Sequence, residues 1–154
     1  MVRNESEQYE GRVVMVQPVA EGARASVFFE DMVGSQIPIA VAHGEGRAQF
    51  ESEEQRRRFV EESLAAIKYV DRRDYSTTDE RIPYPMNPNG SDMNIAGVVT
   101  PDGRFLAVMP HPERVVRTEA NSYVPRDGYA SWTHGPTARL FINARRWVHR
   151  TQGI

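Results

Sequence analysis

Residues 104–114, with the sequence RFLAVMPHPER, decide how this chain is expected to fold. The apolar run 105–109 is typical of a buried strand, and it leads into a histidine and a carboxylate two positions apart, His111 and Glu113. In an extended chain, positions i and i+2 project to the same side, so these two side chains are expected to lie together. A proline on each side of His111 disfavours helix and holds the backbone extended.

A histidine held by a carboxylate can act as a catalytic base. The carboxylate fixes the tautomer of the ring and leaves the second nitrogen to take a proton from a nucleophile, as in a catalytic triad. The segment alone is more often structural, because a histidine beside a glutamate is common in surface loops. Its place directly after a buried-looking strand favours catalysis, since open α/β sheets bind their ligands at strand ends.

The composition is that of an ordinary globular protein of one domain. The chain has 154 residues, of which 40% are hydrophobic and 26% charged. The net charge of -2 predicts no nucleic-acid-binding surface, and no apolar run is long enough to span a membrane. The polar N-terminal residues are unlike a signal peptide, so we expect a cytoplasmic location. The absence of cysteine excludes a thiolate nucleophile and a thiolate metal site within this chain.

The pattern of apolar residues predicts an α/β fold, with a central sheet and flanking helices. A tight turn at 101–103 should join the last two strands into an antiparallel hairpin that leads into His111 and Glu113. An internal proline in the second strand favours an edge position or a bulge. The predicted elements are strands over 11–19, 36–42, 93–100 and 104–109 and helices over 52–67 and 137–149.

A glycine-flanked turn, His43-Gly44-Glu45-Gly46, follows the strand predicted over 36–42. Glycine adopts backbone conformations that other residues resist, and it lets a ligand approach the main chain closely. Taken alone, the segment is more often a plain turn into the next element.

Three segments together resemble one protein family. They are 34–46 (GSQIPIAVAHGEG), 87–91 (NPNGS) and 109–114 (MPHPER). In this order they are similar to the class I glutamine amidotransferase, or glutaminase, domain of the phosphoribosylformylglycinamidine synthases (FGAM synthetases). The segment 135–145 is similar to the end of the large, single-chain form. The resemblance implies a partial flavodoxin-like domain, in which 1–154 is the C-terminal portion and the half with the nucleophile elbow is absent.

The resemblance also implies an activity. In this family a cysteine thiolate attacks the side-chain amide of glutamine, and the catalytic histidine and glutamate correspond to His111 and Glu113. A synthetase domain uses the released ammonia, with ATP and magnesium, to amidate formylglycinamide ribonucleotide in purine biosynthesis. The resemblance places His43, Gly44 and Glu45 near glutamine. It implies no cofactor or metal on this chain, and glutamine and the synthetase domain as its partners.

Without a cysteine, the isolated chain is expected to be inactive. An alternative is a non-catalytic binding or interaction module that kept the scaffold and lost the nucleophile. Hydrolysis by a serine or a metal finds little support, because the histidines lack metal-ligand spacing and no serine lies on a G-x-S-x-G elbow. Strand edges left open by the absent half should make the chain associate with itself or with a partner that covers them.

Overall fold

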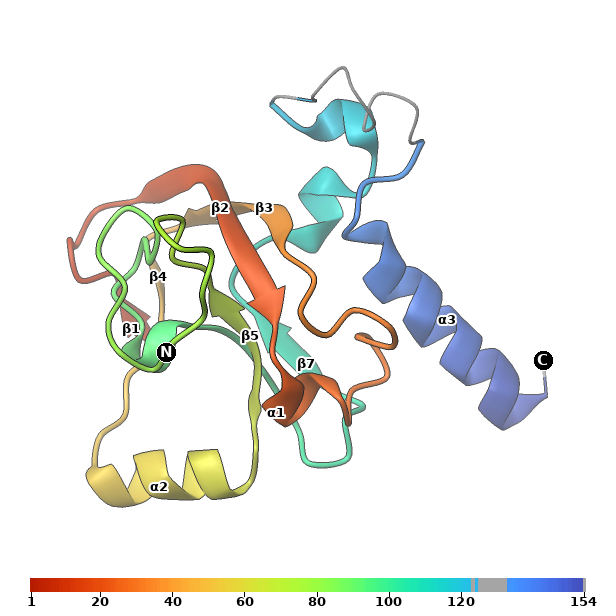
Figure 1. Cartoon of the computed structure of the whole chain (residues 1–154), viewed down its shortest axis with the longest axis horizontal. Coiled ribbons are helices and arrows are strands. Elements are labelled where there is room, and N and C mark those ends of the chain that lie inside the picture. Colours follow the sequence, from red (N-terminus) through yellow and green to blue (C-terminus); the bar gives the residue numbers. More distant parts are fainter. Residues whose placement is uncertain (123, 125–132, 154) are drawn as a thin grey trace.

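A five-stranded sheet forms the centre of the molecule, in the order β3-β2-β5-β6-β7 (Figure 1). The structure is a computed structural model that describes residues 1–122, 124 and 133–153. All neighbouring strands of this sheet run antiparallel. Its strands are β2 (Glu10–Pro18), β3 (Ile37–His43), β5 (Ala65–Tyr69), β6 (Ile95–Val99) and β7 (Leu106–Val108).

The other elements surround this sheet. A two-stranded sheet pairs β1 (Val2–Arg3) with β4 (Glu45–Arg47). The α-helices are α1 (Ala20–Ala23), α2 (Glu53–Glu61) and α3 (Ala138–Gln152). The 3-10 helices are η1 (Asp92–Asn94), η2 (Pro112–Val115) and η3 (Thr118–Ala120). Within the described part of the chain, no helix has the length and apolar character needed to cross a bilayer.

The strand β3 shows how the sequence sets the core. Burial alternates along it, so that Ile37, Ile39 and Val41 enter the core cluster while the residues between them are half-exposed. Pro38 cannot donate a ladder hydrogen bond, and it lies in an edge strand, as predicted. The same alternation places the side chain of His43 on the buried face.

The predicted hairpin is confirmed. The strands β6 and β7 pair antiparallel, with Val99 opposite Leu106. Gly103 closes the turn with a φ of +70° and donates its N–H to the carbonyl of Thr100 at 2.8 Å. Hydrogen bonds from the Thr100 hydroxyl, the Arg104 backbone and the Arg104 guanidinium lower the pKa of Asp102 in this turn to about 2.

The helix predicted over 52–67 is wrong in its second half. The helix begins as expected, because Ser52 Oγ accepts the Gln55 N–H at 3.1 Å. It ends at Glu61, and the positive φ of Ser63, 54°, is incompatible with a continuing helix. All five residues of β5 are buried, including Lys68, so burial does not alternate along it, and the apolar residues at 65–67 fit the spacing of a helix equally well.

The C-terminal helix α3 is confirmed, but a polar residue anchors it. Asn143 is fully buried and donates from Nδ2 to the carbonyls of Phe28 at 3.0 Å and Glu30 at 2.8 Å. Arg150, in the last turn of the helix, forms an ion pair with Glu30 at 2.9 Å. Phe141, although apolar, is 51% exposed.

The chain after β7 crosses to the opposite edge of the sheet. His111 forms an isolated antiparallel bridge with Ala40 of β3, and its backbone N–H donates to the Ala40 carbonyl at 2.7 Å. The sheet is therefore curled, and His111 lies where its first and last strands approach each other.

Candidate active site

His111 and Glu113 lie together, as the spacing predicted. The Nδ1 atom of His111 is 2.7 Å from Oε1 of Glu113. Because an ionised carboxylate only accepts hydrogen bonds, Nδ1 carries the hydrogen and Nε2 is left as a base. The imidazole is 31% exposed, so a reacting group can approach it. The geometry therefore suits proton transfer, and the catalytic role of the pair stays a prediction.

Two features of the backbone set this geometry. The bridge to Ala40 fixes the main chain at His111, and Pro112 begins the 3-10 helix η2 that carries Glu113. Partial burial by itself raises the pKa of Glu113. Hydrogen bonds from its own backbone and from His111, together with the charges of His111 and Arg114, outweigh burial and hold that pKa below its usual value. Glu113 is therefore ionised at neutral pH.

His43 is close to this pair, but its ring is buried. The residue is 6% exposed, and Nδ1 lies 3.1 Å from Oδ1 of Asn4. Burial is the largest cause that lowers the pKa of His43, and the charge of His111 lowers it further. A backbone hydrogen bond and the charge of Glu10 act in the opposite direction. The ring is therefore neutral at pH 7, and its Nε2 atom has no hydrogen-bond partner among the described residues.

The main chain of Gly44 is better placed for a ligand. The carbonyls of His43 and Gly44 accept hydrogen bonds from Asn4, from Nδ2 at 2.7 Å and from the backbone N–H at 3.0 Å. In a trans peptide the C=O and the following N–H point in opposite directions, so the Gly44 N–H points away from Asn4. No atom lies within 4 Å of where a Gly44 Cβ would be, so the space beside it is open. Glu45 is exposed and forms an ion pair with Arg3 at 3.7 Å.

The turn and the catalytic pair are in contact through Met109. A Cβ on Gly46 would lie 2.0 Å from Cε of Met109, two residues before His111, so a side chain at 46 would require the Met109 side chain to move. The φ of Gly46, +140°, also favours glycine. The structure therefore places the turn at 43–46 beside the segment that carries His111, and its role in binding glutamine stays a prediction. The sequence analysis gave no role to Asn4, because one asparagine in a polar N-terminal segment carries no distinguishing signal.

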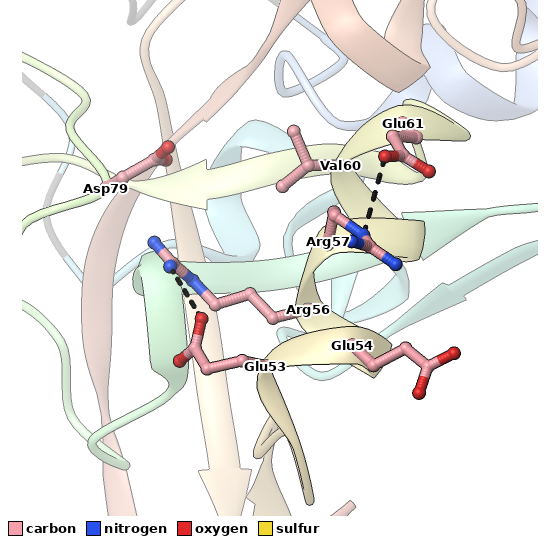
Figure 2. A pocket seen from close by; sticks show the side chains of 7 residues that line it. All are labelled: Glu53, Glu54, Arg56, Arg57, Val60, Glu61 and Asp79. Atoms are coloured by element: carbon pink, nitrogen blue, oxygen red, sulfur yellow. Dashed lines mark hydrogen bonds and ion pairs between the residues drawn. The ribbon is translucent and has the colours of Figure 1, made fainter.

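A separate hollow lies beside α2 (Figure 2). It has a volume of about 720 Å³ and is lined by charged side chains, with Val60 as the apolar exception. Its arginines are paired with carboxylates of the same helix, Arg56 with Glu53 at 3.4 Å and Arg57 with Glu61 at 3.6 Å. None of the predicted site residues lines it, and this charged helix surface gives no reason to assign it a ligand.

Comparisons with known proteins identify a family and two similar enzymes. Residues 1–148 match the family of CobB/CobQ-like glutamine amidotransferase domains. The chain is 54% identical over 151 residues to phosphoribosylformylglycinamidine synthase from Saccharomyces cerevisiae, and 53% identical over 146 residues to that from Schizosaccharomyces pombe. These matches cover 95% and 94% of this chain, which spans 11% of the length of each relative.

The fold has a counterpart among solved structures. The structure of PurLQS from Thermotoga maritima is similar with a TM-score of 0.58 and 23% sequence identity. The similarity covers 96% of this chain and 51% of that chain. This likeness confirms the predicted α/β fold class, and the family match confirms the predicted resemblance. From its sequence, the chain belongs to the family of CobB/CobQ-like glutamine amidotransferase domains.

Proposed function

We propose that this chain is the C-terminal portion of the glutaminase domain of a phosphoribosylformylglycinamidine synthase. Such a domain hydrolyses glutamine and supplies ammonia for the ATP-dependent amidation of formylglycinamide ribonucleotide in purine biosynthesis. The His111–Glu113 pair at 2.7 Å carries the proposal, since it is the base and orienting acid of a triad. The two yeast synthases, at 54% and 53% identity, support the choice of enzyme. ATP and magnesium would be held by the synthetase domain, and the enzyme would work in the cytoplasm.

The proposed mechanism needs a thiolate from residues outside this chain. Nε2 of His111 first takes the proton of the thiol. The resulting thiolate attacks the side-chain amide carbon of glutamine, and His111 then delivers that proton to the amide nitrogen, which leaves as ammonia when the C–N bond breaks. Glu113 stabilises the imidazolium that forms when His111 is protonated. A water molecule, deprotonated by Nε2 of His111, then cleaves the thioester and releases glutamate. Each proton taken up by His111 is returned within the cycle.

The turn at 43–46 would hold the amino-acid end of glutamine. The Gly44 N–H points away from Asn4, the space at the Gly44 Cβ position is open, and a backbone N–H is a suitable donor to the α-carboxylate. The ring of His43 is buried, and the carboxylate of Glu45 forms an ion pair with Arg3. We therefore assign the contribution of both residues to glutamine binding to the shape of the main chain rather than to side-chain contact.

The isolated chain should hydrolyse no glutamine. Activity should appear when the preceding, cysteine-bearing segment of the synthase is produced with it, and a Cys→Ala change in that segment should remove the activity again. Glutamate release, measured by a coupled assay, checks both statements. Hydrolysis by the 154 residues alone would contradict the proposal. Binding of glutamine to the chain alone in calorimetry, without any complementation of activity, would favour the non-catalytic binding module.

We also propose that the open edge of β7 is a pairing surface. Within the described residues, β7 pairs with β6 only, and the adjacent Phe105 is 69% exposed. An uncovered strand edge next to an exposed aromatic side chain favours association. Size-exclusion chromatography with light scattering should therefore show dimers or larger species, and Ala107→Lys on this edge should shift them toward monomer. A clean monomer at micromolar concentration would count against the surface.

A further inference from the structure

The turn at His43–Gly46 is held by its carbonyl groups. Asn4 binds two of these carbonyls: its Nδ2 donates to the His43 carbonyl at 2.7 Å, and its backbone N–H donates to the Gly44 carbonyl at 3.0 Å. The side chain of Asn4 is 1% exposed, and its Oδ1 also reaches Nδ1 of His43 at 3.1 Å. This one residue therefore fixes both the backbone and the imidazole at the start of the turn.

Asn89 holds the other end of the turn from a different part of the chain. Its Nδ2 donates to the Gly46 carbonyl at 3.1 Å, and its Oδ1 accepts from the backbone and the hydroxyl of Ser91. Ser91 Oγ in turn accepts the Ala48 N–H at 3.0 Å. Asn89 is 1% exposed, and within the 87–91 loop its side chain makes the contact to the turn.

These carbonyl contacts determine where the turn's N–H groups point. In each peptide plane the N–H lies opposite to the preceding C=O, so the Asn4 bond to the His43 carbonyl turns the Gly44 N–H away from Asn4. The Asn89 bond to the Gly46 carbonyl fixes the peptide at the other end of the turn. Glycines at both 44 and 46 give the turn conformational freedom, so without these hydrogen bonds the Gly44 N–H would adopt many orientations. An N–H held in one direction binds an anion better than one that must be ordered on binding.

We infer that Asn4 and Asn89 are positioning residues that hold the turn at 43–46 in the conformation that binds the amino-acid end of the substrate. The inference rests on the proposed function, which places glutamine at this turn. Neither asparagine touches substrate in this account. Both act through main-chain carbonyls, so they set the affinity for glutamine and leave the chemical step at His111 unchanged.

The test uses isosteric changes in the complete synthase that carries this chain. Asn89→Asp keeps the Oδ1 acceptor and removes the donor to Gly46. Asn87→Asp is its matched control, because Asn87 lies in the same loop, is 2% exposed, and donates to the Ser91 carbonyl and to Asn94 rather than to the turn. Asn4→Asp removes the donor to His43, and its control is Asn143→Asp on α3.

We expect Asn89→Asp and Asn4→Asp each to raise the KM for glutamine about tenfold, with kcat within about twofold and ammonia-dependent synthesis unchanged. The control variants should lower the melting temperature to a similar degree without changing the KM. Unchanged KM in both test variants, or an equal rise in the controls, would overturn the inference. If one test variant does not fold, the other decides. Failure of the proposed function would give a different result: glutamine-dependent synthesis would survive removal of the His111 ring.

Discussion

Replacing His111 with alanine should abolish glutamine-dependent synthesis by the complete enzyme while ammonia-dependent synthesis continues at its original rate. We expect glutamine-dependent kcat to fall about a thousandfold or more, since the ring both accepts and returns the proton. The change removes the ring alone, because the backbone N–H of residue 111 still donates to the carbonyl of Ala40. Paired assays with glutamine and with ammonium salts measure the two activities.

Two further variants make the result interpretable. Glu113→Gln keeps an oxygen near Nδ1 but removes the negative charge that stabilises the imidazolium, so glutamine use should fall about a hundredfold. His149→Ala, on an exposed position of α3, should have no effect. Loss of both glutamine-dependent and ammonia-dependent synthesis in His111→Ala would instead show that the ring is structural.

The catalytic pair could be predicted from sequence because its geometry is local. His111 and Glu113 are two positions apart between prolines, and an extended backbone brings their side chains together without help from the rest of the fold. The hairpin before them was equally accessible, because its turn residues and flanking apolar runs are adjacent in the chain. The bridge between His111 and Ala40 could not be predicted in this way, because it joins residues 71 positions apart and no local pattern indicates such a pairing.

The error at β5 has a different cause. A strand that is buried along its whole length shows no alternation of apolar and exposed polar positions, and in β5 even Lys68 is buried, so residues 65–67 give the same signal as the apolar face of a helix. The positive φ of Ser63 separates α2 from β5, but a serine at this position does not indicate a positive φ. The surrounding sheet, rather than local propensity, decides this segment.

Buried asparagines were the other feature that pattern reasoning missed. Asn4, Asn89 and Asn143 are each at most 1% exposed, and each donates to main-chain carbonyls of distant segments. Polar residues are ordinarily placed at the surface, and a sequence does not reveal which ones find partners inside. These residues join loops that carry little regular structure, and two of them support the predicted glutamine-binding turn.

A substitution in the hairpin turn should strongly destabilise the fold, because Gly103 lies against the main chain of another segment. A Cβ at this position would lie 1.8 Å from the carbonyl oxygen of Ala25 and 2.5 Å from its carbonyl carbon. The Gly103 carbonyl also accepts the Val27 N–H at 3.0 Å, so the turn cannot move away without losing that bond. The segment it touches leads directly to Phe29, which is 1% exposed in the core.

Gly103→Ala should therefore lower the free energy of unfolding of the chain by about 4 kcal/mol, since both a left-handed φ and a backbone clash must be relieved. Gly34→Ala is the matched control, because Gly34 has a φ of +81° and no atom within 4 Å of its Cβ position. Only the conformational cost applies there, about 1 kcal/mol. Urea unfolding followed by circular dichroism measures both, and equal losses would show that the turn yields easily. Because this hairpin leads into His111, the larger loss at Gly103 should also weaken complementation by the cysteine-bearing segment, whereas Gly34→Ala should leave it intact.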